Sequence, residues 1–295
     1  MKYLIKQNKI IIEDLSQFNI EQIMDCGQIF RYFIANKNLT EVVSTNHYAQ
    51  IITNKNNVEI ITSDVEYFVN FFDLNRDYNE IKTELNSDEF LAESLKFGYG
   101  IRILNQDVFE MIVSFIISAN NNIKRIKNSL NVLSQKFGTK LNTNIDFAIS
   151  NSPLSVNENG KVSFYAFPTL EQLKMATIED FVKAGLGYRA TYMYHTIQNL
   201  TLLQLEQFKQ MDFNQQLEFL LNLKGVGEKV AHCILLFSTH QTNVFPVDTW
   251  INKVYNDLTK TSSTNRKMIS KVLTAKYGHL SGYAQQYFFY YYRNK

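Results

Sequence analysis

Cysteine, proline and glycine are scarce in this chain of 295 residues, which contains 2, 3 and 11 of them respectively. The two cysteines, Cys26 and Cys233, exclude a scaffold of several disulfide bonds and any iron–sulfur or metal site that needs four cysteine ligands. The low proline and glycine content excludes a collagen-like or low-complexity chain. Because 45% of the residues are hydrophobic and 20% are charged, the sequence predicts a globular protein with a sizeable core.

Long hydrophobic runs are also absent from the sequence. The most apolar stretch, residues 111–119, is far shorter than the roughly 18 residues of a membrane-spanning helix. The amino-terminal segment MKYLIKQNKIIIEDL has no uninterrupted apolar run, so no signal peptide is expected. We therefore expect an intracellular protein without membrane contact, in the cytoplasm or nucleoid of a bacterium or in the nucleus of a eukaryote.

Basic residues are concentrated near the carboxyl end, although the net charge is only +2. Residues 222–295 contain ten lysines and arginines against three acidic residues, whereas residues 1–100 contain nine against fifteen. A basic segment on an otherwise acidic or neutral chain favours a surface that binds a polyanion such as DNA. On charge alone, a solvated basic face without a ligand is the simpler interpretation.

Short runs of β-branched and aromatic residues, separated by asparagine-rich breaks, occupy the first 62 residues and predict an antiparallel meander. The predicted strands are Lys9–Ile12, Ile29–Ile34, Thr40–Ser44, Tyr48–Ile52 and Val58–Thr62. From Asp64, a predicted helix N-cap, apolar residues recur at helical spacing, and nearly all of the remaining chain is predicted helical. The predicted helices after residue 100 are Val108–Ser118, Ile123–Phe137, Leu170–Met175, Ile178–Ala184, Thr191–Leu205, Phe213–Leu221, Glu228–Phe237, Thr249–Leu258, Lys267–Tyr277 and Tyr283–Tyr292.

Strands followed by a run of helices indicate an α+β fold. We predict an antiparallel β domain with covering helices over residues 1–100 and a helical domain over residues 101–295. The polar stretches Thr139–Phe164 and Asn256–Arg266 are predicted loops. The β portion has too few strands to be stable alone unless the helical segment Asp64–Leu74 covers one face, so the two halves should share an interface.

A helix-hairpin-helix is the most specific local pattern, at about residues 213–238. The segment Gly225-Val226-Gly227 joins two apolar helical patterns, and Lys229 falls in the first turn of the second. Two glycines allow a tight turn, and backbone N–H groups at the start of a helix can approach a phosphate closely. Such a hairpin binds the DNA backbone without reading sequence. A tight turn between helices with no ligand is the alternative for these residues alone.

About twenty residues later, Pro246-Val247-Asp248 precedes the next predicted helix, where Asp248 suits an N-cap. Paired glycines, a lysine and then Pro-Val-Asp, in this order, resemble the helix-hairpin-helix DNA glycosylase superfamily. Further segments in the same order resemble its 8-oxoguanine DNA glycosylases, a family whose fold is a small antiparallel β domain followed by two helical subdomains. The segments are Gly27-Gln28-Ile29-Phe30-Arg31, Ser118-Ala119-Asn120-Asn121-Asn122-Ile123-Lys124-Arg125-Ile126, Ala166-Phe167-Pro168-Thr169-Leu170 and Leu186-Gly187-Tyr188-Arg189-Ala190.

The resemblance implies that Lys229 is the catalytic nucleophile and that Asp248 stabilises the positive charge that develops on the sugar. An amine that displaces a base from C1′ of deoxyribose can form a Schiff base, which permits β-elimination of the 3′ phosphate. Since lysine is mostly protonated at neutral pH, we expect the site to favour the neutral amine through partial burial and the positive end of a helix. A surface lysine that contacts a phosphate is the alternative role.

The resemblance also implies a pocket for the flipped base. The carbonyl of Gly27 would accept the N7–H that distinguishes 8-oxoguanine from guanine, Gln285 would read the Watson–Crick edge, and Phe289 would stack on the base. Cys233, one helical turn after Lys229, would reach the same pocket. A turn glycine, a core cysteine and an aromatic packing cluster are the corresponding structural alternatives.

Asn120, Arg125, Tyr188 and Arg189 match family residues that fill the gap left by the flipped base and contact the unpaired cytosine. Arginine donors suit the acceptors of cytosine, although phosphate contacts or surface ion pairs are alternatives. Eukaryotic members usually have a histidine near the backbone after Pro-Val-Asp, whereas this chain has Thr249-Trp250. That departure puts one phosphate contact in doubt.

The leading hypothesis is a monomeric enzyme that releases 8-oxoguanine opposite cytosine from double-stranded DNA and cleaves the abasic strand. It implies no metal and no redox cofactor, and it leaves open whether hairpin carbonyls hold a monovalent cation. The alternatives are a non-catalytic helix-hairpin-helix DNA-binding protein and a monofunctional glycosylase for another purine.

Overall fold

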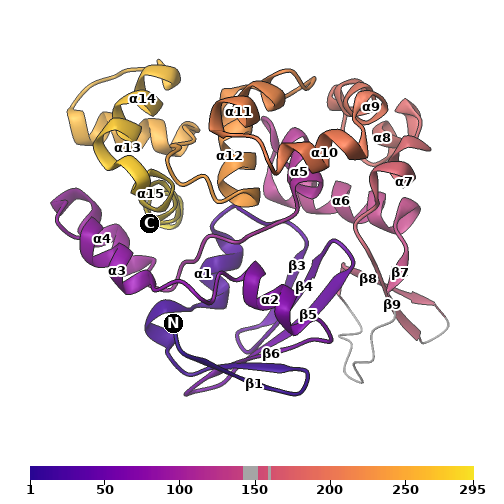
Figure 1. The fold of residues 1–295 in the computed structure, drawn as a ribbon, viewed down its shortest axis with the longest axis horizontal. Coiled ribbons are helices and arrows are strands. Elements are labelled where there is room, and N and C mark those ends of the chain that lie inside the picture. Colours follow the sequence, from indigo (N-terminus) through magenta and orange to yellow (C-terminus); the bar gives the residue numbers. More distant parts are fainter. Residues whose placement is uncertain (142–151, 159–160) are drawn as a thin grey trace.

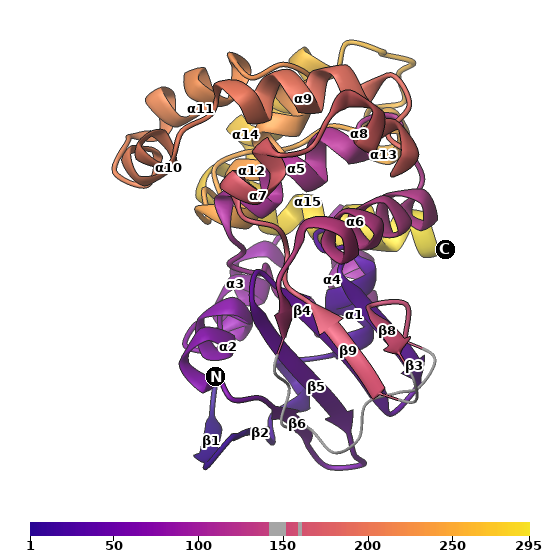
Figure 2. The same ribbon diagram turned by 90° about the vertical axis from the view of Figure 1, so that its right-hand side faces the viewer.

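A computed structural model describes residues 1–141, 152–158 and 161–295. Helices form one layer over a β sheet, and a smaller sheet lies beside the first (Figures 1 and 2). The large sheet is antiparallel with strand order β1-β2-β6-β5-β4-β3. Its strands are β1 Tyr3–Lys6, β2 Lys9–Ile12, β3 Tyr32–Asn36, β4 Leu39–Ser44, β5 His47–Thr53 and β6 Val58–Ile61.

The predicted meander is present as the four consecutive strands β3 to β6. Strand β2 pairs with β6, and β1 forms the edge of the sheet beyond β2. Strands β4 and β5 pair Ser44 with His47 across the turn Thr45-Asn46. The strand β1 and the helix α1 Ile20–Asp25 were not predicted from the sequence. Asn19 is the N-cap of α1, and its side chain accepts a hydrogen bond from Gln22 N.

The predicted helices α5 Val108–Ser118 and α6 Ile123–Phe137 have the predicted limits. The prediction of one helix over Thr191–Leu205 was wrong, because Thr201 and Gln204 form a capping box that starts a new helix. The helices in and around these segments are α2 Val65–Phe71, α3 Tyr78–Leu85, α4 Glu89–Phe97, α7 Leu170–Lys174, α8 Ile178–Lys183, α9 Arg189–Asn199, α10 Leu202–Phe208, α11 Phe213–Leu221, α12 Glu228–Ser238, α13 Thr249–Thr259, α14 Arg266–Tyr277 and α15 Ser281–Asn294, with 3-10 turns at Leu15–Gln17 and Gly278–Leu280.

Three further predictions need correction. The predicted loop Thr139–Phe164 contains the strands β7 Lys140–Leu141, β8 Ser155–Glu158 and β9 Lys161–Tyr165, while its residues 142–151 and 159–160 lie outside the described part. The predicted loop Asn256–Arg266 is shorter, because α13 continues to Thr259. Helix α2 begins after Asp64 as predicted, but the Asp64 side chain makes no capping hydrogen bond to the helix. Its Oδ2 lies 3.2 Å from His47 Nδ1 instead.

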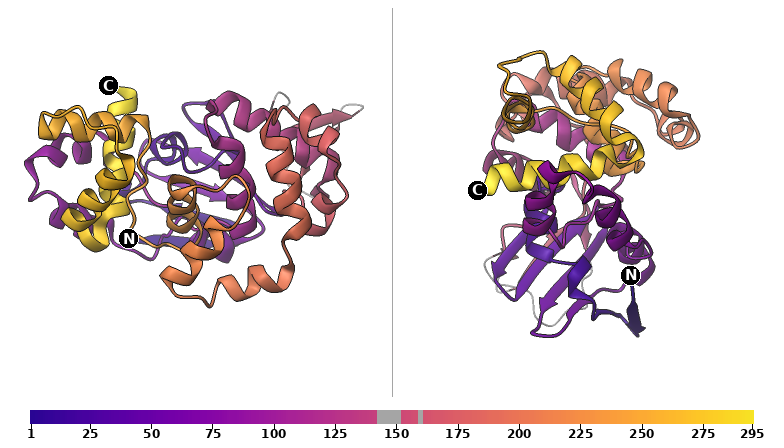
Figure 3. Two further views of the ribbon diagram at one scale, coloured as in Figure 1. Left: turned by 90° about the horizontal axis from the view of Figure 1, so that it is seen from above. Right: turned by 90° about the vertical axis from the view of Figure 1, so that its left-hand side faces the viewer.

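The β and helical parts share buried surface around the first helix and the last. Helix α15 packs against α4 and against α13 (Figures 1 and 3). Cys26 and Phe30, which follow α1, belong to the same hydrophobic core as the helices after residue 100. The small sheet packs on the large one through Phe164 and Tyr48, whose ring centroids are 4.4 Å apart. A domain boundary near residue 100 stays a prediction.

Candidate active site

The hairpin between α11 and α12 uses its two glycines differently. Gly225 has a φ of +85°, in the left-handed region that favours glycine, and Tyr192 packs against it. Gly227 has an ordinary φ of −99° and is the N-cap of α12. The backbone conformation of the turn therefore requires glycine at position 225 and not at position 227. A Cβ at Gly227 would meet nothing within 4 Å, so its small size leaves room for a ligand at the helix N-terminus.

A narrow pocket at the end of this hairpin brings together six of the residues singled out in the sequence. They come from the loop after α1, from α12, from the N-cap of α13 and from α15. The cavity has a volume of about 70 Å³. The residues that line it and that the sequence had already indicated are Gly27, Lys229, Cys233, Asp248, Gln285 and Phe289.

Lys229 is the second residue of α12, and its side chain is half-buried. In the part of the chain that the structure describes, its ammonium forms no ion pair, and Nζ lies 5.5 Å from the ring centroid of Phe115. Burial raises the pKa of the Cys233 thiol, one turn further along α12, while the ammonium of Lys229 lowers it. Burial therefore disfavours the thiolate form of Cys233.

Asp248 is held by the helix that follows it. Its Oδ1 accepts a hydrogen bond of 2.9 Å from Ile251 N, as expected of an N-cap. The cap fixes the carboxyl group at the pocket, where it is half-buried. A carboxylate fixed at the pocket with Lys229 can stabilise a positive charge that develops between them.

Gly27 lies in the loop between α1 and β3 with a φ of +77°. A Cβ built there would lie 2.9 Å from Cε1 of Phe289, so the phenylalanine ring rests directly on this glycine. With a volume of about 70 Å³, the pocket has room for about two water molecules. A purine base can therefore enter only when the ring moves away from Gly27.

The sequence reasoning missed several pocket residues. Gln286 is buried, its Nε2 donates a 2.8 Å hydrogen bond to Gln285 Oε1, and its own Oε1 has no partner among the described residues. No feature of the sequence indicated that Gln286, as well as its neighbour Gln285, would face the pocket. Phe115 and Phe237 lie within the apolar helices α5 and α12, where the sequence pattern indicates ordinary core. The missed lining residues are Cys26, Phe115, Phe237, Pro246 and Gln286.

The four residues predicted to contact the unpaired cytosine lie near the starts of two helices: Asn120 follows α5, Arg125 is in the first turn of α6, and Tyr188 and Arg189 are the N-cap and first residue of α9. Asn120 and Tyr188 are exposed, and Asn120 has a positive φ of 52° that is uncommon for asparagine. Arg125 is also exposed. Arg189 differs, because it is only 5% exposed and donates to the carbonyls of Ala119, Asn120 and Leu186.

These bonds use four of the five N–H donors of Arg189. The structure therefore gives Arg189 a supporting role, in which it holds the loop that carries Asn120. A direct contact of this guanidinium with the unpaired cytosine would require some of these bonds to break. Tyr188 packs on the guanidinium, whose Cζ lies 4.4 Å from the ring centroid.

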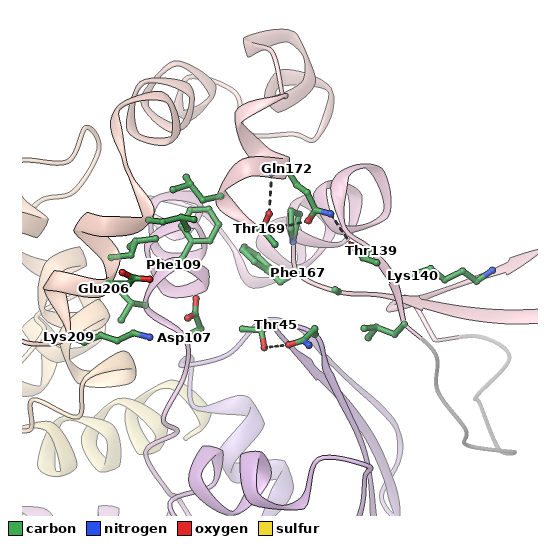
Figure 4. A pocket seen from close by; sticks show the side chains of 18 residues that line it. Thr45, Asp107, Phe109, Thr139, Lys140, Phe167, Thr169, Gln172, Glu206 and Lys209 are labelled. Carbon is green, nitrogen blue, oxygen red and sulfur yellow. Dashed lines mark hydrogen bonds between the residues drawn. The ribbon is translucent and has the colours of Figure 1, made fainter.

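A larger cavity of about 610 Å³ lies between the β4–β5 turn, the start of α5, and helices α7 and α10 (Figure 4). Its apolar wall includes Phe109 and Phe167. Gln172 bonds to both Thr169 and Thr139 at its rim, so these polar groups hold the strand–helix junction together. The cavity contains none of the predicted site residues.

Within the described ranges, no group of three or more histidine, cysteine, aspartate or glutamate side chains could hold a metal ion. No helix in the same ranges is both long and apolar enough to cross a bilayer.

A helix-hairpin-helix that presents a lysine, followed by a helix whose N-cap aspartate lines the same pocket, next to an antiparallel β domain, defines the class of helix-hairpin-helix DNA glycosylases. Residues 113–277 match the HhH-GPD superfamily of base excision DNA repair proteins, and residues 10–112 match the N-terminal domain of 8-oxoguanine DNA glycosylase. The chain belongs to the HhH-GPD superfamily and carries the N-terminal domain of its 8-oxoguanine glycosylase branch.

Similar proteins agree with this assignment. The chain is 33% identical to N-glycosylase/DNA lyase OGG1 of Arabidopsis thaliana over 70% of its length, and it spans 57% of that protein. It is 31% identical to a probable N-glycosylase/DNA lyase of Methanothermobacter thermautotrophicus over 76% of this chain and 72% of the other. The 8-oxoguanine glycosylase/lyase of Clostridium acetobutylicum, solved with double-stranded DNA containing cytosine opposite 8-oxoG, is 36% identical with a TM-score of 0.88 and coverage of 99% and 98%.

Proposed function

We propose that this protein is a bifunctional repair enzyme that releases 8-oxoguanine opposite cytosine from duplex DNA through Lys229 and then cleaves the abasic strand. One observation carries the proposal. The half-buried amine of Lys229, the capped carboxylate of Asp248 and the loop of Gly27 line a single pocket at the end of a hairpin suited to the DNA backbone. The named activities of the glycosylase/lyase relatives support the same reaction and substrate.

The chemistry follows from the positions of the two polar groups. The neutral amine of Lys229 attacks C1′ of the flipped nucleotide, and the bond from C1′ to the base breaks, so the base leaves with the bonding electron pair and takes up a proton. Asp248 stabilises the positive charge on the sugar. As the sugar ring opens, an imine forms between Lys229 and C1′, and the two protons lost by the amine pass to the released base and to the ring oxygen. A C2′ proton then passes to solvent, its electron pair forms the C2′–C3′ double bond, and the bond from C3′ to the 3′ phosphate breaks.

The family resemblance and the open space at Gly227 support the rest of the proposal. The N-terminus of α12 receives a phosphate of the lesion strand, Gln285 and Phe289 hold the base, and Asn120 with Arg125 faces the unpaired cytosine. We propose further that the enzyme acts as a monomer. No redox cofactor enters these steps. An enzyme with this substrate works at the nucleoid of a bacterium or in the nucleus of a eukaryote.

Borohydride trapping on 8-oxoguanine duplex tests the proposal, because reduction of the imine joins protein and DNA covalently. The wild-type protein should form the adduct and Lys229→Gln should not, while Lys229→Gln still binds the duplex. Lys224→Gln, at an exposed hairpin lysine, is the matched control and should keep the adduct. An adduct that persists in Lys229→Gln eliminates this nucleophile. A wild-type protein that binds without any adduct or base release points to a non-catalytic DNA-binding protein. Base release without an adduct points to a monofunctional glycosylase.

A further inference from the structure

One face of α15 carries three residues spaced four apart, Gln285, Phe289 and Arg293. Side chains at this spacing lie one above another on a helix. The first two line the base pocket, and Arg293 lies one turn beyond Phe289. Its Nη2 forms an ion pair of 2.6 Å with Oδ1 of Asp25. Asp25 is the last residue of α1 and stands two residues before Gly27.

The guanidinium of Arg293 therefore lies beside two opposing walls of the pocket, the ring of Phe289 and the backbone at Gly27. Its Cζ lies 5.5 Å from the ring centroid of Phe289. Its Nη1 lies 3.9 Å from the position that a Cβ of Gly27 would occupy, and this nitrogen is buried without a hydrogen-bond partner among the described residues. Only 16% of the Arg293 side chain is exposed, against 37% for Asp25.

The spacing between these two walls decides whether a base fits. In the structure the ring of Phe289 rests on Gly27 and the pocket is too narrow for a purine. The two walls belong to segments that are far apart in sequence, and the Asp25–Arg293 ion pair joins these segments next to the pocket. An ion pair with one partner largely buried is less screened than an exposed one. It can therefore hold α15 in place while the ring of Phe289 swings about its own side-chain bonds.

We propose that the Asp25–Arg293 ion pair positions Phe289 relative to Gly27 and so sets the gap into which the flipped base is inserted. Arg293 acts here as a positioning residue that works through Phe289. The inference rests on the proposed function, since it concerns the same pocket and the same flipped base. It assigns to Arg293 an effect on base release and none on strand cleavage at a site that has already lost its base.

Asp25 also interacts with a second cation, Lys127, and this determines which variants the experiment needs. The Nζ of Lys127, on α6, lies 3.2 Å from the ring centroid of Tyr32, and Asp25 is one of the charges that act on it. When Arg293 is replaced, Lys127 still balances the charge of Asp25 but provides no link to α15. Both partners of the ion pair therefore have to be replaced, separately and together.

The test compares Arg293→Met, Asp25→Asn and the double variant in two single-turnover assays, base release from 8-oxoguanine duplex and strand cleavage of abasic duplex. Each single variant should release the base about tenfold more slowly, which corresponds to about 1.4 kcal/mol. Cleavage of abasic duplex should stay within about twofold. The double variant should be no slower than either single variant, because all three remove the same link. Arg293→Lys should restore part of the rate.

Lys9→Gln is the matched control, because Lys9 forms an ion pair of 2.8 Å with Glu59 between β2 and β6, away from the pocket. It should leave both assays unchanged. Equal losses in both assays, additive losses in the double variant, or an unchanged rate of base release would each overturn the positioning role. If the wild-type protein itself releases no 8-oxoguanine, the proposed function fails instead, so the two failures are distinguishable.

Discussion

Replacement of Gly27 by alanine perturbs the pocket in two separable ways. The φ of +77° is unfavourable for alanine, and a new Cβ would lie 2.9 Å from Cε1 of Phe289, closer than Cβ contacts in real structures. A residue held in such a conformation costs about 1–3 kcal/mol. For a domain of this size, the melting temperature should fall by roughly 2–4 °C per kcal/mol. Crowding therefore acts first on Phe289, before any base is present.

The second effect concerns the flipped base. If the carbonyl of Gly27 accepts the N7–H of 8-oxoguanine, a shift of that carbonyl and of the ring of Phe289 weakens one hydrogen bond. Such a loss is worth about 1–3 kcal/mol, which is roughly one to two decades in rate. Abasic duplex presents no base to crowd, so its affinity for Gly27→Ala should match that of the wild-type protein.

The assay measures single-turnover release of 8-oxoguanine, affinity for abasic duplex and thermal unfolding of the same preparations. Gly227→Ala is the matched control, because its φ of −99° suits alanine and a Cβ there meets no protein atom. It should leave unfolding unchanged and weaken binding of both duplexes. For Gly27→Ala, equal losses on both duplexes would show that Gly27 is only structural, and unchanged base release would remove it from the pocket.

Three further predictions concern the fold and the DNA surface. Arg189→Met should destabilise the protein by about 1–3 kcal/mol in urea unfolding, because the buried carbonyl of Leu186 and the part-buried carbonyls of Ala119 and Asn120 lose their donor. Exposed Arg125→Met should stay within about 0.5 kcal/mol and reduce the preference for cytosine opposite the lesion. The reverse order would refute these roles. Burial raises the pKa of Glu110 from 4.5 to about 7, so the folded state binds a proton that the unfolded state loses, and stability should fall as the pH rises from about 4.5 to about 7. In Glu110→Gln, the free energy of unfolding should depend less on pH between pH 5 and 8. A slope of stability against pH equal to that of the wild-type protein would contradict the raised pKa of Glu110. Log affinity for duplex DNA should fall linearly with log salt by roughly 0.9 per phosphate contact, and a flat response argues against backbone binding by the basic residues 222–295.

Local signals in the sequence predicted most of the elements and the polar half of the pocket. Asp248 functions as the expected cap, and Lys229 stands at the start of a helix after a glycine turn, because caps and turns are encoded within a few residues. The break between α9 and α10 was missed although Thr201 and Gln204 carry it, because the apolar period runs through the break.

Contacts between distant segments could not be predicted in this way. Phe289 on Gly27, Arg293 with Asp25, and Arg189 with the loop of Asn120 each join segments whose separate patterns are unremarkable. Arginine in particular has the same appearance in a sequence whether it meets solvent, DNA or buried carbonyls. Its role follows only from the partners that the fold supplies.

The contact between Gly27 and Phe289 also bears on the order in which the protein gains its activities during folding. The two residues are about 260 positions apart, so the base pocket closes one of the longest loops in the chain, and long loops close late. The hairpin of α11 and α12 is local and can form early. The loop lengths therefore predict that the hairpin forms first during refolding and that the two walls of the base pocket meet last.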